Sequence, residues 1–375
     1  MERRASCVMP LLLSLQAVAG IALYTAPNAY AAAHAVGQPA APIYTAEALR
    51  HRAGALRCCE ASDASAICAG SHIVTAISGD GSISAKAVVT TDTVEEVRRL
   101  QGLEGLACAA LGRALSCSML IAEGLKEDET FQVKFAGDGP LRGVLATCNG
   151  RLESRGYVGN PSVTLPPNAK GKFDVGAGVG KGTLQVVRTK HLPGETLPTQ
   201  YSSITEIRSG EVPEDINYFL VESEQRQGAL AAGVFVKGGD GSAEVTAAGG
   251  WYVQLLPFAA EEQIARLEQN LAAIADRSVT DMVRDGLDAK DMIELLLEGM
   301  EPQFTEPASI PGIAESCPCS DERVFRTMRL LPKEELKQIM EENEVIEAKC
   351  EFCGTVYRMT PEQIAQNMQV MASDI

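Results

Sequence analysis

Four cysteines near the end of the chain, Cys317, Cys319, Cys350 and Cys353, have the residue type and the spacing of a metal site. They form one Cys-Pro-Cys pair and, after an interval of thirty residues, one Cys-Glu-Phe-Cys-Gly turn. Four thiolates match tetrahedral zinc with no open position, which is typical of a closed site and not of a catalytic one. No histidine follows His191, so a site with both cysteine and histidine ligands would need residues that are distant in the sequence. The pattern predicts that these cysteines hold one zinc ion per chain in the reduced state.

The same spacing suits oxidation. Cysteines one or two residues apart can close a local disulfide once the metal leaves, and four thiolates on one metal are electron-rich. Zinc contributes about 10–16 kcal/mol to the folding of small modules, whereas whole domains are stable by about 5–15 kcal/mol. Loss of the metal is therefore expected to unfold the module around it. The plainer alternative is a zinc clip that only staples a small fold.

Seven further cysteines lie outside this cluster and have no metal-ligand spacing. A total of eleven is odd, which does not suggest a secreted disulfide framework. We interpret the later ones as small core residues or idle thiols, and the sequence assigns them no role. The seven are Cys7, Cys58, Cys59, Cys68, Cys108, Cys117 and Cys148.

The site must be positioned by the strands and helices that precede it. Their mixture predicts an α+β fold, with a sheet-based core over residues 71–256 and helices packed on one face of its sheet. The segment His72–Thr90 alternates apolar and polar residues around Gly79-Asp80-Gly81, which predicts a hairpin. Thr93–Ala122 is rich in Ala and Leu and is predicted to be a helix. Further strands are expected at Thr130–Phe135, Gly143–Asn149, Thr183–Thr189 and Ser203–Ile207. Helical segments are expected at Tyr218–Gln225 and Ala229–Val236, and a buried apolar run at Trp251–Leu256.

Two smaller units follow the core. Residues 257–311 are predicted to form a helical linker, because Glu261–Ala275 and Lys290–Met300 carry apolar residues at helical spacing and can cover the sheet. The end of this linker, Glu301–Pro311, has three prolines and is expected to be a hinge. Residues 312–375 are the zinc module, with a short helix at Pro332–Glu342 and another that begins at Thr360 with a capping-box pattern.

The first 70 residues have the composition of a targeting sequence. Two arginines, an apolar run over Val8–Ala26 and an Ala-x-Ala stretch have the layout of a signal peptide. An Ala-rich, acid-poor stretch then resembles a transit peptide, so two-step import into a plastid is expected, with a mitochondrion as the alternative. Simple secretion fits poorly with cysteines that must begin reduced. If the N-terminus is not a targeting signal, the cytoplasm is expected.

A membrane span is the rival interpretation of the apolar run over Val8–Ala26. Polar and helix-breaking residues interrupt it, however: Pro10, Gln16 and Gly20. We therefore expect no stable membrane association after processing.

The charge of the chain disfavours nucleic acid as a partner. The net charge is −16, and residues 261–375 alone hold 24 Asp and Glu against 11 Lys and Arg. Such an acidic surface repels phosphate backbones.

Nucleotide binding and catalysis are also disfavoured. The glycine-rich segment Val175–Thr183 is not a phosphate loop, because Gly182 follows Lys181 where a Ser or Thr is required. We interpret it as a glycine-rich turn and expect no need for ATP. The four histidines show no nucleophile–base arrangement, so an enzyme is not expected.

The segment from Cys317 to Tyr357 resembles the zinc module of the 33 kDa chaperonin family, a group of redox-regulated heat-shock holdases. It combines Cys-x-Cys-Ser-x-Glu-Arg, a leucine-rich helix, and Cys-x-Phe-Cys with a tyrosine four residues on. There are two departures: Arg226-Gln227-Gly228 stands where a Pro-Thr pair is expected, and the first 70 residues have no counterpart in the compact bacterial form. In all, the resemblance covers roughly residues 73–365 and continues upstream through Val133–Leu141, Gly150–Pro161, Gly178–Thr183, Tyr218–Gln225 and Gly249–Pro257.

The resemblance implies an ATP-independent holdase that is activated by peroxide or stronger oxidants together with unfolding stress. Oxidation would join Cys317 to Cys319 and Cys350 to Cys353, release zinc, unfold the module and loosen the linker. The implied partners are unfolded or partly unfolded client proteins, and a second copy of the chain in an oxidised homodimer.

Two other functions stay open. A thiol-disulfide oxidoreductase would use Cys350 and Cys353, but that motif normally opens a helix after a strand. A structural zinc adaptor would bind one folded partner.

Overall fold

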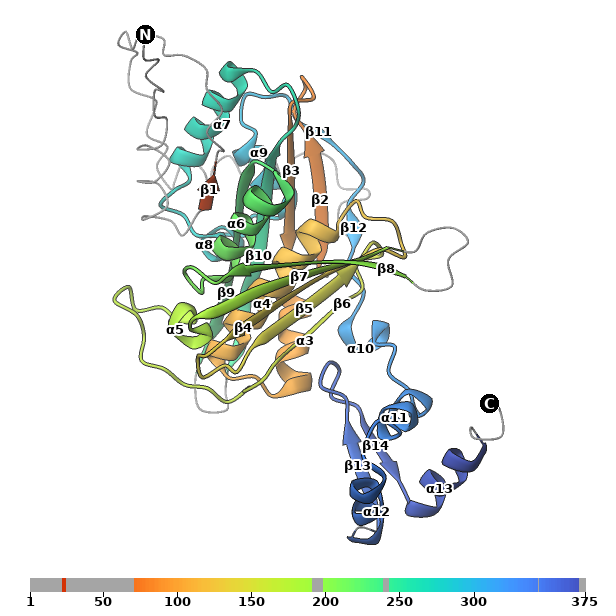
Figure 1. Ribbon diagram of the computed structural model, residues 1–375. Coiled ribbons are helices and arrows are strands. Elements are labelled where there is room, and N and C mark those ends of the chain that lie inside the picture. The colour runs from red at the N-terminus through yellow and green to blue at the C-terminus, as the bar shows by residue number, and fades with distance from the viewer. Residues whose placement is uncertain (1–21, 25–70, 191–197, 239–242, 343, 371–375) are drawn as a thin grey trace, which may run out of the picture.

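The computed structural model describes residues 22–24, 71–190, 198–238, 243–342 and 344–370. Two antiparallel sheets form the main body, and a small module lies at the C-terminal end (Figure 1). One sheet has the strand order β6-β5-β4-β7-β8. Its strands are β4 (Thr130–Gly137), β5 (Val144–Asn149), β6 (Ser154–Val158), β7 (Gly182–Lys190) and β8 (Thr199–Glu206).

The other large sheet has the order β1-β9-β10-β3-β2-β11, and β12 also pairs with β2. The predicted hairpin is confirmed as β2 and β3, in which His72 lies opposite Val89. The three residues of β1 pair with β9 and fall within the predicted targeting sequence, the rest of which lies outside the described residues. The strands are β1 (Ala22–Tyr24), β2 (His72–Ile77), β3 (Ile83–Val89), β9 (Gly228–Lys237), β10 (Glu244–Leu255), β11 (Gln303–Phe304) and β12 (Ala308–Ser309).

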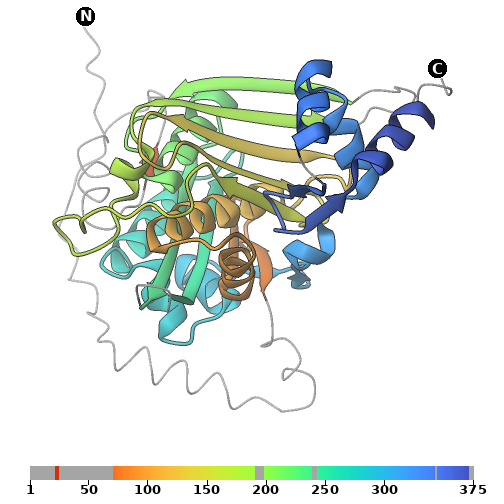
Figure 2. The same ribbon diagram turned by 90° about the horizontal axis from the view of Figure 1, so that it is seen from below.

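Helix α4 (Gly105–Ala122) is the centre of the core and packs between the two sheets, as Figure 2 shows from below. All its residues except Gly105 and Arg113 are buried. Within the described part of the chain, it is the one helix long and apolar enough to cross a membrane, but it is enclosed by the fold. Its apolar character on every side is therefore that of a core helix.

The predicted single helix over Thr93–Ala122 is instead two helices. Helix α3 (Thr91–Gln101) ends where Gly102 takes a left-handed φ of 66° and donates its backbone N–H to Arg98. Glycine adopts this conformation without steric cost, and it terminates helices for that reason.

Three linker helices cover the face of the seven-stranded sheet that is opposite α4. They are α7 (Glu261–Ala273), α8 (Val279–Arg284) and α9 (Ala289–Leu296). The predicted linker helices are thus confirmed as α7 and α9, and α8 was missed although Ser278 and Asp281 form a capping box in the sequence. The linker residues buried on this face include Leu267, Leu271, Ile274, Met282, Met292, Ile293, Leu296 and Leu297.

Helices cover both faces of this sheet, and the predicted helix at Ala229–Val236 is wrong. The segment is strand β9, which pairs with β10. Ala229 and Ala231 belong to the cluster under the linker, whereas Leu230 and Val234 belong to the cluster around α4. A strand that is buried on both faces loses its alternation, and its apolar run cannot be told from a helix by periodicity.

Other boundaries differ less. Tyr218–Gln225 is the second half of α6 (Val212–Glu224), and the Trp251–Leu256 run is the end of β10. The expected glycine-rich turn at Val175–Thr183 contains the short helix α5 (Val175–Val179), capped by Asp174, before β7 begins. The expected hinge at Glu301–Pro311 carries β11 and β12, which pair with β2.

Candidate metal centre

The C-terminal module is a hairpin with helices around it. The hairpin consists of β13 (Ile346–Lys349) and β14 (Val356–Met359). Its helices are α10 (Ile313–Ser316), α11 (Asp321–Met328), α12 (Lys333–Glu342) and α13 (Pro361–Val370). The predicted helices at Pro332–Glu342 and Thr360 are thus confirmed. A small core holds the module together: Phe325, Met328, Ile346, Met359 and Ile364 are buried, with Leu336, Ile339 and Met340 packed against them. Such a core is too small to stabilise a module of this size unaided.

Two turns carry the cysteines. Cys317 follows α10, and Cys319 lies just before Ser320, whose side chain caps α11. Cys350 and Cys353 lie in the turn between β13 and β14, where the Cys350 N–H donates to Thr355 and the Gly354 N–H donates back to Cys350. Local capping and turn chemistry therefore fix both pairs.

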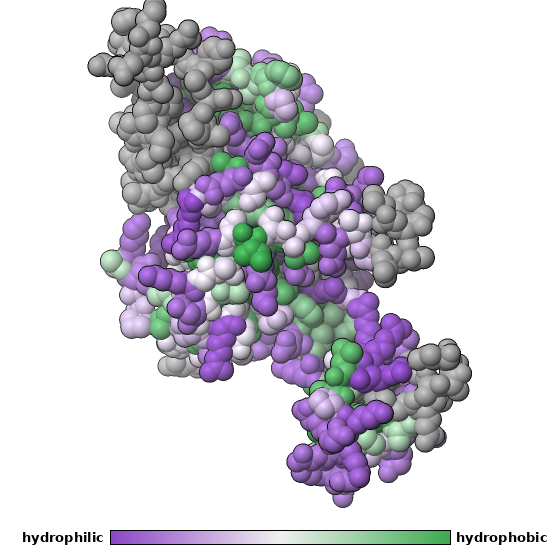
Figure 3. Space-filling model, in the orientation of Figure 1, coloured by the Kyte–Doolittle hydropathy of each residue, from purple (hydrophilic) through white to green (hydrophobic). Residues whose placement is uncertain are grey.

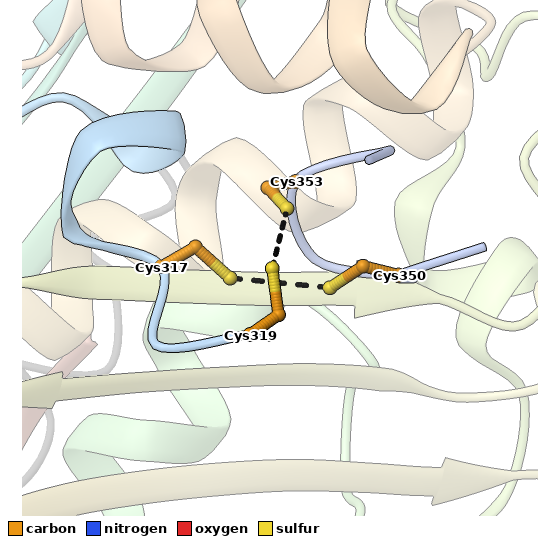
Figure 4. A group of neighbouring side chains, drawn as sticks. All are labelled: Cys317, Cys319, Cys350 and Cys353. Atoms are coloured by element: carbon orange, nitrogen blue, oxygen red, sulfur yellow. Dashed lines mark hydrogen bonds between the residues drawn. The ribbon is translucent and has the colours of Figure 1, made fainter. Parts of the chain in front are cut away.

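The structure brings all four predicted residues together, with their sulfurs pointing toward one another (Figure 4). The Sγ atoms of Cys317 and Cys350 are 3.9 Å apart, and those of Cys319 and Cys353 are 3.4 Å apart. All four sulfurs lie within 4.8 Å of one another. Four sulfurs at about 2.3 Å from a shared zinc ion would be about 3.8 Å apart, so the cluster has the dimensions of a tetrahedral metal site.

The surroundings of the sulfurs act on the thiolate form in opposite directions. Burial raises the pKa of the Cys317 and Cys350 thiols, which disfavours their thiolates. Burial acts the same way on Cys353, but hydrogen bonds with the hydroxyl and backbone of Thr355 lower the pKa of this thiol to about 7. Thiolates are the form that binds a metal, and a dication offsets the cost of holding several of them together. The donor set of four cysteines suits zinc.

Besides Thr355, a second residue that the metal-ligand spacing does not indicate contacts the cluster. The Tyr357 hydroxyl donates a hydrogen bond to the Cys319 sulfur at 3.0 Å. Tyr357 lies opposite Ala348 in the hairpin, so the strand register aims its side chain. Hydrogen bonds from such outer residues orient metal ligands and tune their reactivity.

The remaining described cysteines lie away from this cluster. Cys108, Cys117 and Cys148 are buried in the main core, which agrees with their interpretation as small core residues. Burial raises the pKa of Cys108 to about 12 and that of the other two further still, so these thiols are unreactive. Cys7, Cys58, Cys59 and Cys68 lie outside the described residues.

Comparisons with known proteins agree on one family. The family model described as Hsp33 protein matches residues 71–360. The chain is 40% identical over 298 residues to the 33 kDa chaperonin of Acaryochloris marina, which covers 79% of this chain and 95% of that protein. It is 34% identical over 302 residues to the 33 kDa chaperonin of Clostridioides difficile, over 80% of this chain and 99% of the relative.

A solved structure is also similar. The crystal structure of the 33 kDa chaperonin (heat shock protein 33 homolog) from Thermotoga maritima matches with a TM-score of 0.71 and 31% identity, over 80% of this chain and 99% of that chain. The family match contains the four clustered cysteines and the whole linker, and it begins directly after residues 1–70.

Proposed function

This chain belongs to the Hsp33 family, and from that premise we propose that it is a redox-regulated, ATP-independent chaperone. It holds unfolding client proteins under oxidative stress. The observation that carries the proposal is how the four sulfurs are connected to the linker. The segment that joins them contains β11 and β12, and both strands pair with β2 in the sheet that the linker covers. The chemistry of the site thereby acts on the packing of the linker.

In the reduced state, Cys317, Cys319, Cys350 and Cys353 hold one zinc ion, which keeps the module folded. The linker lies on the sheet, and the residues between them form an apolar cluster separate from the one around α4. The opposite side of the molecule is mostly hydrophilic, with only scattered apolar patches (Figure 3). A chaperone that binds unfolded chains needs apolar surface, so the face beneath the linker is the surface to be released.

Oxidation at the cysteines affects the linker through the segment of chain that connects them. Each pair of thiolates gives two electrons to one peroxide, so that one S–S bond and two hydroxide ions form and the O–O bond breaks. The loss of the thiolates ends metal binding and unfolds the module. The next elements toward the linker are α10 and the two-residue strands β12 and β11, which pair only with the edge of β2. Such short pairings detach easily, and the linker helices then lose their anchor.

The proposed disulfides join Cys317 to Cys319 and Cys350 to Cys353. In the folded module, sulfurs of different pairs contact each other, Cys317 with Cys350 at 3.9 Å and Cys319 with Cys353 at 3.4 Å. Bonds between sequence neighbours nevertheless close much shorter loops than bonds across the thirty residues between the pairs, and shorter loops cost less entropy to close. Peptide mapping of the oxidised protein should therefore find the neighbour bonds, and bonds between the pairs would contradict this pairing.

The activated form binds unfolded or partly unfolded proteins and associates as a homodimer, since exposed apolar surface also favours self-association. The test uses a heat-unfolded client without ATP. Protein treated with peroxide at elevated temperature should suppress aggregation, reduced protein should do so poorly, and reductant with zinc should reverse the difference. Equal suppression by the two forms would reject the switch and leave a zinc clip.

We further propose that residues 1–70 direct the protein to a plastid. This rests on the signal-like and transit-like composition and on the family match, which begins only at residue 71. A fluorescent fusion of residues 1–70 should enter plastids. Delivery to mitochondria would favour the alternative, and delivery to the medium would contradict both.

A further inference from the structure

Helix α3 contacts both halves of the four-cysteine site. On the first half, the carboxylate of Glu96 accepts hydrogen bonds from the backbone N–H groups of Ile313 and Ala314, both at 2.9 Å. These residues open α10, which leads directly into Cys317. Glu96 therefore ties the chain just ahead of the first cysteine pair to the core.

On the second half, Gln101 contacts the turn between Cys350 and Cys353. Its side-chain amide nitrogen donates to the carbonyl oxygen of Phe352 at 2.8 Å and to that of Gly156 on β6 at 2.7 Å. A primary amide has two N–H donors, so both bonds form at once. Gln101 thus bridges the core sheet and the peptide between two metal-binding cysteines.

Two further contacts seat the same turn. The Phe352 ring packs edge-on against Tyr157 with centroids 5.6 Å apart, and the guanidinium of Arg155 lies 5.3 Å from its centre. Gly354 has a φ of +72°, and a Cβ there would lie 2.4 Å from the carbonyl oxygen of Leu100. Only glycine fits this close approach, so the turn rests directly on the end of α3 (Figure 1).

We propose that Gln101 and Phe352 are positioning residues that dock the cysteine turn onto the end of α3 and thereby set how readily the site loses its metal. This inference rests on the proposed zinc site. The docked turn holds Cys350 and Cys353 at a fixed distance from the pair that Glu96 anchors, so the four ligands are preorganised. By linkage, a bound metal also holds the turn on the core.

The test follows zinc loss from the reduced, zinc-loaded full chain into excess chelator. Gln101→Glu keeps the shape of the side chain but replaces the amide donor by a carboxylate, which cannot donate to the carbonyl oxygens of Phe352 and Gly156. We expect about tenfold faster zinc loss for Gln101→Glu and for Phe352→Ala, the effect of losing one buried hydrogen bond or ring contact. The peroxide dose that releases half the zinc should fall as well, while one zinc per chain still binds.

The matched control is Gln338→Glu, the same change on α12, where the hydrogen bond of Gln338 is to Glu342 in its own helix. It should lose zinc at the rate of the unaltered protein. Phe352→Ala should also keep the thermal midpoint of the core, which separates docking from general destabilisation. If both docking variants lose zinc at the unaltered rate, the inference is wrong. Because chelation needs no oxidant, a failure of peroxide to release zinc would contradict the redox switch and not this docking.

Discussion

Asn270 on α7 donates its side-chain amide to the carbonyl oxygen of Leu296, the last residue of α9, at 3.1 Å. The same nitrogen lies 3.0 Å from the carbonyl oxygen of Glu298. Asn270 is buried, so these bonds tie two linker helices together where water does not compete.

Replacing Asn270 by Ala should loosen the linker, because the carbonyl groups at the end of α9 lose their buried donor. Such a loss costs about 1–3 kcal/mol. We expect faster hydrogen exchange in α7 and α9 and measurable aggregation suppression by the reduced protein. Gln269→Ala, at the exposed neighbouring position, should change neither. Unchanged exchange in Asn270→Ala would show that the pair does not hold the linker.

Serine at any of Cys317, Cys319, Cys350 or Cys353 should weaken zinc binding severely, because a hydroxyl does not replace a thiolate as a zinc ligand. Metal analysis of protein prepared without chelator checks this, with one zinc per chain expected for the unaltered protein. Serine at Cys148, a buried core position, is the control and should retain the metal. Absence of zinc from the unaltered protein would contradict the assignment of the site.

Tyr357→Phe should make the site more sensitive to peroxide. The Tyr357 hydroxyl donates to the Cys319 sulfur, and a hydrogen-bond donor withdraws electron density from a thiolate. Without it we expect several-fold faster zinc release at a fixed peroxide concentration, with the zinc content of the reduced protein unchanged. A rate equal to that of the unaltered protein would assign Tyr357 a packing role only.

Acid should weaken the contact that Glu95 makes between α3 and the rest of the core. A hydrogen bond from Arg98, supported by the N–H of Val245 and by Arg99, lowers the pKa of Glu95 from its ordinary value of 4.5 to about 2. A depressed carboxyl pKa stabilises the fold above pH 4.5, and this stabilisation is lost as the pH falls from 4.5 toward 2. Glu95→Gln should therefore lower the unfolding free energy at pH 7 by about 2–3 kcal/mol, and by about half as much at pH 3, where the Glu95 carboxylate is still mostly ionised.

The control for this pH dependence is Glu127→Gln, at an exposed position. Denaturation curves of the core at the two pH values check the prediction. An equal loss at pH 3 and pH 7 would mean that Glu95 stabilises the fold by packing and not by its charge.

The sequence was most informative where the chemistry is local. Paired cysteines, the hairpin around Gly79-Asp80-Gly81 and the amphipathic helices α7 and α9 were all predicted from short patterns. Each of these features depends on residues that are close together in the sequence, so the spacing of residue types is sufficient to predict it.

The failures have a shared cause in long-range packing. Strand β9 was expected to be a helix because both of its faces are buried, by α4 on one side and by the linker on the other. The contact of Gln101 with Phe352 joins residues 251 positions apart, and no local pattern indicates it. The strand pairing at β11 and β12 was hidden in the same way, since prolines nearby indicate an irregular segment.

The central claim is that oxidation at the cysteines uncovers the sheet face beneath the linker, and Trp251 reports on that face directly. It is the single tryptophan of the chain, it is 1% exposed, and it belongs to the apolar cluster that the linker covers. Peroxide treatment at elevated temperature should shift its emission to the red and open it to acrylamide quenching, and reductant with zinc should restore the starting values. If Trp251 stays shielded from the quencher in oxidised protein that fully suppresses client aggregation, the active surface lies elsewhere and this account is contradicted.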